Sequence, residues 1–205
     1  VIWSTRTFLV VGLLAVGLAS LIGLIIGSFA GFYGGTIDMI LMRLTETFLV
    51  LPGFLLALIL VAFFGGSIWN IIIVIGIVSW TPIARVVRAE FLSLKERPFV
   101  EGLKALGLGD LKIIFSEILP NALPPVMVNV TLSIASANLM EASLSFLGAG
   151  DPNQVSWGIM LQRAQIFLHQ AWWMMVFPGI ALFLAVLAVN MVGDGLNDVL
   201  NPRVR

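Results

Sequence analysis

The residue types that covalent catalysis needs are nearly absent from this sequence of 205 residues. It contains no cysteine and a single histidine, His169. The chain therefore has no thiolate nucleophile, and one histidine cannot by itself form a His-based metal site. No Gly-x-x-x-x-Gly-Lys-Ser/Thr phosphate-binding loop occurs either, so we expect the chain neither to bind nor to hydrolyse ATP. We predict a protein that is not an enzyme and holds no metal or cofactor of its own.

Polar residues within the otherwise apolar segment 122–147 are the first candidates for a functional site. At the centre of a membrane helix an ionised carboxylate costs about 2.5–3.5 kcal/mol, so Glu141 should face protein or water. We expect this segment to line an aqueous path, and the candidate residues are Asn129, Ser133, Asn138 and Glu141. The alternative is that individual Ser, Thr and Asn side chains hydrogen-bond neighbouring helices together.

A second candidate is the hydrophilic stretch 85–121, which holds five of the eleven acidic and six of the eleven basic residues. We predict a short helix over 99–106 that ends at Gly107, because glycine accepts the left-handed conformation of a helix C-cap. Asp110 should cap a second helix over 111–119, which Pro120 should end. This second helix places four apolar side chains on one face, namely Leu111, Ile114, Phe115 and Ile118.

Such a helix-glycine-helix element has two interpretations. It could dock a short helix into a groove on a partner protein, or it could lie on a membrane surface as an amphipathic connector. The residue pattern alone leaves both open.

The elements that position these residues are membrane spans, because 60% of the chain is hydrophobic and only 11% is charged. About 20 apolar residues cross a hydrocarbon core of about 30 Å. Five segments qualify, at 8–31, 47–65, 68–84, 122–147 and 172–193. We therefore predict an all-α polytopic membrane protein with five transmembrane helices. The formal net charge of zero leaves no basic field for nucleic acid.

The distribution of Lys and Arg predicts the orientation, because cytoplasmic connections are rich in them. With the N-terminus outside, the outer side holds only Arg6 and Arg163. The cytoplasmic side then holds the other nine, which are Arg43, Arg85, Arg88, Lys95, Arg97, Lys104, Lys112, Arg203 and Arg205. We predict that the C-terminus is cytoplasmic.

The first span carries a ridge of small residues spaced four apart: Ala15, Ala19, Gly23, Gly27 and Gly31. Such a ridge lets another helix backbone approach closely. We favour a contact within this subunit over a contact with a second membrane subunit. Pro52 and Pro82 lie within or near spans, where proline bends a helix, although prolines are common in membrane helices generally.

The stretch 85–121 contains three short motifs: Glu101-Gly102-Leu103, then Gly107, and then Ile118-Leu119-Pro120-Asn121. In residue type and spacing they resemble the EAA loop of ABC importer permeases. Gly102 and Leu103 replace the two alanines of the family pattern. Further motifs are similar to the branch that imports dipeptides, oligopeptides or nickel: Ser145-Phe146-Leu147-Gly148, Ser156-Trp157-Gly158, Phe177-Pro178-Gly179, Gly193-Asp194-Gly195-Leu196-Asn197-Asp198 and Asn201-Pro202-Arg203.

The resemblance implies the fold of a type I ABC importer transmembrane domain over 1–205, with 85–121 as the coupling loop that binds a cytoplasmic ATPase. The coupling residues that it implies are Glu101, Gly102, Leu103, Lys104, Ala105, Leu106, Gly107, Asp110 and Pro120. Because members of this branch usually carry one more N-terminal helix, we expect a segment to precede Val1. Pro120 and the segment 85–97 are the expected joints between the loop and its spans.

The resemblance also implies partners and a location. The chain should lie in the cytoplasmic membrane among lipid, with two ATPase subunits, an external substrate-binding protein and a second permease, usually a different chain. Peptides are the expected substrate, and nickel or a nickel chelate is the alternative. An ATP-independent channel or secondary transporter is a further alternative, but no span other than 122–147 holds an acid or base in its middle, which argues against self-powered transport.

Overall fold

The computed structural model describes residues 1–200, so the terminal motif Asn201-Pro202-Arg203 and Arg205 lie outside the described residues. Within this range every regular element is helical. The helices are α1 (Ser4–Tyr33), α2 (Gly35–Val50), α3 (Gly53–Phe64), α4 (Ile68–Val78), α5 (Trp80–Lys95), α6 (Pro98–Ala105), α7 (Asp110–Lys112), the π-helix η1 (Ile113–Ile118), α8 (Leu119–Phe146), α9 (Trp157–Ala164), the 3₁₀ turn η2 (Gln165–Phe167) and α10 (Trp173–Leu200).

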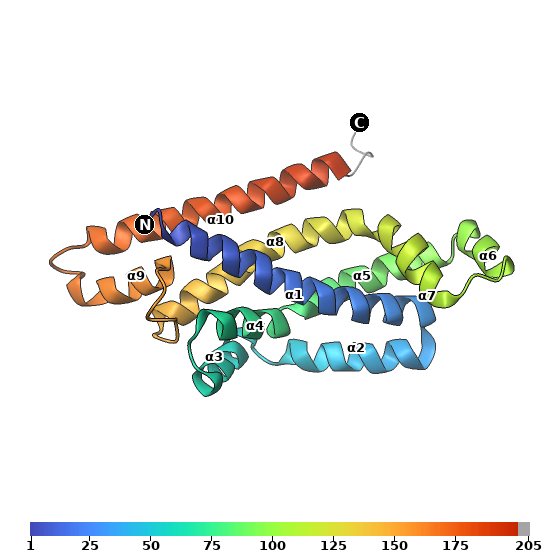
Figure 1. Cartoon of the computed structure of the whole chain (residues 1–205), viewed down its shortest axis with the longest axis horizontal. Coiled ribbons are helices and arrows are strands. Elements are labelled where there is room, and N and C mark those ends of the chain that lie inside the picture. Colours follow the sequence, from blue (N-terminus) through green and yellow to red (C-terminus); the bar gives the residue numbers. More distant parts are fainter. Residues whose placement is uncertain (201–205) are drawn as a thin grey trace.

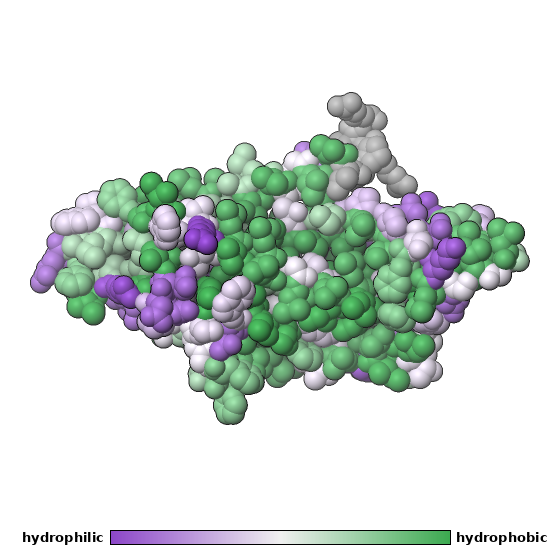
Figure 2. Space-filling view, in the orientation of Figure 1, coloured by the Kyte–Doolittle hydropathy of each residue, from purple (hydrophilic) through white to green (hydrophobic). Residues whose placement is uncertain are grey.

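The described residues contain four continuous stretches long and apolar enough to cross a membrane: Ser4–Tyr33, Ile68–Lys95, Asp110–Phe146 and Trp173–Val199. The bent pair α2 and α3 makes a fifth when it is counted as one span, which agrees with the five predicted. The long helices run lengthwise, with α6 and α7 at one end and α9 at the other (Figure 1). The visible face is largely apolar between these ends, as a lipid-embedded protein requires (Figure 2).

The second span, predicted over 47–65, is broken at Pro52, which agrees with the expectation that proline bends a helix there. α2 ends at Val50, α3 begins at Gly53, and the two helices meet at 83°. Pro52 explains the break, because a proline disfavours helical geometry in the preceding residue. Leu51 is accordingly extended, with ψ at 129°.

The third span is longer than the predicted 68–84. α4 and α5 together form a stretch of 28 residues, from Ile68 to Lys95. The segment 85–97 is therefore mostly helix rather than loop, and the connection to α6 begins only after Lys95. The sequence missed this extension because arginines ended the apolar run, whereas Ile83, Val87 and Phe91 continue a buried face at helical spacing.

The ridge of small residues on α1 packs against α5 of the same chain, as favoured. A Cβ atom on Gly27 would lie 2.5 Å from the carbonyl oxygen of Ala84, and one on Gly31 would lie 2.5 Å from Cβ of Phe91. Ala15 and Ala19 are fully buried on the same helix. Only glycine lets the two backbones approach this closely, so α1 and α5 form the tightest helix pair around which the other elements are arranged.

Candidate coupling and pathway sites

The predicted helix break at Gly107 is confirmed, and its geometry is that of a Schellman motif. Gly107 has a φ of +79°. Its N–H donates to the carbonyl oxygen of Lys104 at 2.9 Å, and the N–H of Leu108 donates to that of Leu103 at 3.2 Å. These two bonds satisfy carbonyl groups that the end of α6 would otherwise leave unpaired. α6 is therefore a helix with a defined end, not a frayed turn.

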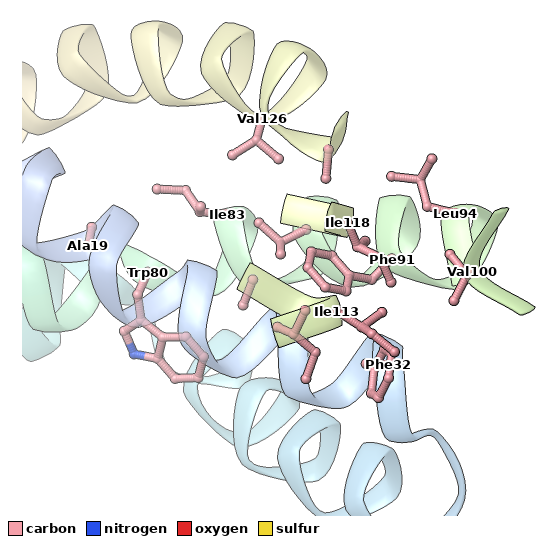
Figure 3. Packing of buried hydrophobic residues seen from close by; sticks show 14 residues of the cluster. Ala19, Phe32, Trp80, Ile83, Phe91, Leu94, Val100, Ile113, Ile118 and Val126 are labelled. Atoms are coloured by element: carbon pink, nitrogen blue, oxygen red, sulfur yellow. The ribbon is translucent and has the colours of Figure 1, made fainter. Parts of the chain in front are cut away.

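One face of α6 is anchored to the helix bundle. Val100 is fully buried in a core cluster with Phe91, Ile113 and Ile114, while Leu103 and Leu108 pack against its edge. Figure 3 shows Val100 beside the side chains of α5 and η1. This face explains why an element of only eight residues holds its position.

Lys104 provides a second attachment, because its Nζ lies 5.1 Å from the centroid of the Phe32 ring at the end of α1. A cation over an aromatic face is attracted by the ring's quadrupole. α6 therefore contacts both α5 and α1, the two helices that pack most tightly against each other.

The opposite face of α6 is exposed. Glu101, Gly102 and Ala105 are exposed, and Leu106 is 78% exposed although its side chain is apolar. A protruding leucine beside charged residues, on a helix whose other face is fixed, is typical of a surface that inserts into a groove. This arrangement fits the docking interpretation of the helix-glycine-helix element.

The second predicted helix of the loop differs from expectation in two ways. Asp110 does not cap it: Gly109 occupies the N-cap without a side-chain bond, and Asp110 lies in the first turn. There its negative charge still favours the helix N-terminus. Pro120 does not end the helix, because η1 runs directly into α8, and Asp110–Phe146 forms one stretch of 37 residues.

The π-helix η1 also changes which side chains are buried. Leu119 donates its N–H to the carbonyl oxygen of Ile114, an i to i+5 bond that widens the turn. Ile113, Ile114 and Ile118 are fully buried, whereas Leu111 and Phe115 are exposed. The prediction that Leu111, Ile114, Phe115 and Ile118 share one face assumed an α-helical period, and it fails because two of the four are buried and two are exposed. Sequence periodicity carries no signal for a π turn.

An ion pair that sequence reasoning missed joins α2 to α5. Arg88 donates from Nε to Oδ1 of Asp38 at 2.5 Å and from Nη2 to Oδ2 at 2.6 Å. The two side chains are 33% and 17% exposed. A bidentate guanidinium–carboxylate pair fixes orientation as well as distance. The residues are 50 apart in sequence, so no local pattern relates them.

The polar residues of α8 divide between two faces of the helix. Asn129, Ser133, Ser136 and Ser143 fall at i, i+4, i+7 and i+14 and are half-buried or exposed. Asn138, Glu141 and Ser145 fall on the opposite face and are buried. Of the four candidate pathway residues, Asn129 and Ser133 therefore lie where water or a partner can reach them.

Asn138 and Glu141 lie in the protein interior, which corrects their assignment as pathway-lining residues. Asn138 is 1% exposed, and a Cβ on Gly12 of α1 would lie 2.3 Å from its Nδ2. Glu141 is 6% exposed and accepts a hydrogen bond from Ser145 Oγ at 2.7 Å. Glu141 faces protein, which was one of the two environments expected for it. Hydrophobic spacing alone could not decide between the two faces of a helix that is polar on both.

The segment 147–156 holds the other end of the bundle together. Asp151 accepts a hydrogen bond from the N–H of Ile68 at 3.0 Å, at the start of α4. Val155 accepts a bond from Thr7 Oγ1 of α1 at 2.9 Å, and Trp157 donates from Nε1 to the carbonyl oxygen of Val1 at 3.0 Å. This connection therefore ties α1, α4, α8 and α9 together opposite α6.

Comparisons with known proteins agree with this architecture. Residues 23–205 match the family described as binding-protein-dependent transport system inner membrane component. The dipeptide transport system permease protein DppC of Alkalihalophilus pseudofirmus is 40% identical over all of this chain and 68% of its own length. The di/tripeptide transport system permease protein DppC of Pseudomonas aeruginosa is 38% identical over the same shares.

Two solved structures have a similar fold. A chain of the MetNI methionine ABC transporter in an inward-facing conformation superposes with a TM-score of 0.76 at 20% identity, over 97% of this chain and 94% of its own. A chain of an amino acid ABC transporter gives a TM-score of 0.70 at 16% identity, over 96% and 91%. The fold and the family match together lead to one conclusion: this chain belongs to the inner-membrane permease components of binding-protein-dependent ABC importers.

Proposed function

We propose that this chain is the permease subunit of an ATP-driven importer for peptides and forms half of the translocation pathway. The observation that carries the proposal is α6, a capped helix with one face buried in the bundle and Leu106 protruding from the other. The names of the relatives support peptides rather than nickel as the substrate. ATP hydrolysis then belongs to a separate cytoplasmic subunit, and an external binding protein delivers the substrate.

The α6 end is the cytoplasmic end in this proposal. Lys95, Arg97, Lys104 and Lys112 lie in or beside α6 and α7, whereas α9 and its connections carry Arg163 alone. Excess Lys and Arg in short connections marks the cytoplasmic side. The N-terminus of α1 lies towards the opposite end and is therefore external (Figure 1).

Movement of the ATPase would reach the spans through rigid contacts. The ATPase holds the exposed face of α6, and the buried Val100 transfers that movement to α5 and η1. The Asp38–Arg88 pair carries it on to α2. Packed cores are bistable rather than continuously deformable, so approach of two coupling helices would switch the spans between inward-open and outward-open arrangements.

The pathway itself runs along the accessible polar face of α8, opposite a second permease subunit. Lipid cannot satisfy the hydroxyl and amide groups on this face, but water or a second subunit can. A cysteine at Ser133 should therefore react with a hydrophilic thiol reagent in the assembled transporter, whereas one at the buried Ala137 should not. Equal reactivity at the two positions would contradict the assignment of this face.

A disulfide cross-link tests the coupling role of α6. Because the chain has no native cysteine, an introduced cysteine is the only one in this subunit that can form the cross-link. Leu106→Cys should cross-link to a cysteine in the groove of the partner ATPase, with a yield that changes when ATP is added. Arg163→Cys, an exposed position at the opposite end, is the matched control and should form no such cross-link. If cysteines at Leu106 and Ala105 form no cross-link in a complex that contains the ATPase, the proposed coupling mechanism is refuted.

A further inference from the structure

A cavity of about 690 Å³ opens between α2, α5 and α8, on the side of α5 turned away from α1. Five of its ten lining residues are apolar. The other five are polar or charged: Thr45 and Glu46 of α2, Arg85 and Arg88 of α5, and Asn129 of α8. Ligand sites of small molecules commonly combine apolar walls with a few polar groups in this way.

The charges in this cavity are not equally available. Arg88 is held by Asp38 through two hydrogen bonds. Arg85, by contrast, makes no ion pair with any of residues 1–200. Glu46 pairs only with Arg43, at 3.3 Å and with side chains 62% and 80% exposed, a contact too solvated to be strong. The cavity therefore offers one free cation and one loosely held carboxylate.

Asn129 adds an unused hydrogen-bond acceptor. Its Oδ1 is buried and has no hydrogen-bond partner within the described chain. A buried acceptor without a donor is costly, so such an atom calls for a ligand that carries an N–H or O–H group. Asn129 is also the first residue of the accessible polar face of α8, so the cavity is continuous with the proposed pathway.

We propose that this cavity is a binding site for the two charged ends of a short peptide. Arg85 receives the terminal carboxylate, since a guanidinium matches carboxylate geometry in two parallel hydrogen bonds. Glu46 and the Oδ1 of Asn129 accept from the terminal ammonium group. This inference rests on the proposed peptide import and adds the chemistry by which the permease itself holds its substrate.

An anionic lipid headgroup is the rival occupant, because basic pockets between membrane helices bind such groups. The phosphodiester of such a lipid would use Arg85 but would be repelled by Glu46, and it carries no N–H or O–H of its own for the acceptor of Asn129. Two acceptors beside one free cation therefore favour a zwitterion over an anion.

Cysteine protection in the assembled transporter tests the site without relying on the binding protein. Ala89→Cys places a thiol on the cavity wall, and Ser93→Cys places one a turn further along α5, outside the lining. Complexes in phosphatidylcholine nanodiscs are labelled with a hydrophilic thiol reagent at increasing concentrations of dialanine. Dialanine should slow labelling at position 89 and leave position 93 unchanged.

Two modified peptides identify the charges involved. Dialanine amide lacks the carboxylate, and N-acetyl-dialanine lacks the ammonium group, so each should need about tenfold or more higher concentration for half-protection. Arg85→Gln should raise the half-protection concentration of dialanine by the same factor. It should not change that of dialanine amide, which has no carboxylate for Arg85 to bind. Glu46→Gln should behave likewise towards the acetylated peptide, whereas Arg43→Gln should not weaken protection by any of the three.

Three outcomes would overturn this site. They are equal protection by all three peptides, no protection by dialanine, and protection that appears only when phosphatidylglycerol replaces phosphatidylcholine, which would identify a lipid site. Uptake of dialanine by the same complex separates the two proposals. Uptake without protection refutes the cavity alone, whereas a complex that hydrolyses ATP but takes up no peptide refutes the proposed function.

Discussion

Replacement of Gly27 by alanine tests whether the α1–α5 contact holds the subunit together. The new Cβ would lie 2.5 Å from the carbonyl oxygen of Ala84 and 2.7 Å from Cβ of Val87. Ordinary van der Waals contact begins at 3.4 Å, so the backbones must separate by about 0.9 Å. Overpacking of this kind costs about 1–3 kcal/mol. Because the obstacle is a backbone carbonyl on a straight helix, a side-chain rotation cannot relieve it.

Gly17→Ala is the matched control. Gly17 lies on the same helix, and its Cβ would meet nothing within 4 Å. Alanine is a better helix former than glycine by about 0.8–1.0 kcal/mol, so this variant should be neutral or slightly stabilised. We therefore expect Gly27→Ala to be less stable than Gly17→Ala by at least about 1–3 kcal/mol.

The assay is unfolding of the purified transporter in mixed micelles of increasing denaturing-detergent content, followed by tryptophan fluorescence. Peptide uptake by the same variants shows whether the loosened pair also loses coupling, because α5 carries the anchoring contacts of α6. Equal stability of the two variants would refute the conclusion that the glycine ridge sets the distance between α1 and α5.

Three further pairs of variants test other contacts. Arg88→Ala should destabilise the subunit by about 1.5–3 kcal/mol, because it removes charge-assisted hydrogen bonds in a partly buried site. Arg43→Ala removes an exposed ion pair and should cost less than about 1 kcal/mol. Equal unfolding midpoints for the two variants would contradict this. Gly107→Ala should cost about 1–2 kcal/mol and lower transport per ATP hydrolysed, because its φ of +79° strains any residue with a Cβ. Gly102→Ala should lose no stability, because its Cβ would meet nothing within 4 Å. The checks are unfolding midpoints and coupled uptake in proteoliposomes, and an unimpaired Gly107→Ala would argue against the capping role. Glu141→Gln keeps an acceptor for the buried hydroxyl of Ser145, so it should give at most a small transport defect and leave ATPase association unchanged. Glu141→Leu should lower the free energy of unfolding by about 1–3 kcal/mol. Loss of the ATPase from the Gln variant would show that Glu141 has an architectural role.

Sequence spacing was sufficient for the features that depend on neighbours along the chain. The five apolar spans, the helix ended by Gly107 and the small-residue ridge of α1 are all local patterns, and each is present in the structure. The bend of the second span belongs with them, because Pro52 acts through the backbone of its neighbour Leu51. Other differences from expectation have no signal in the sequence. The π turn of η1 changes the helical period without any marker in composition.

The sequence by itself determined that this chain has the apolar spans of a membrane protein and presents a helix-glycine-helix element, because hydropathy and glycine conformation are properties of short segments. Only the tertiary structure decided which polar face of α8 is accessible, that Asp38 meets Arg88, and that Arg85, Glu46 and Asn129 share one cavity. Those features join residues of α2, α5 and α8 that lie far apart in the sequence, so the packing of the helices, and not spacing along the chain, brings them together.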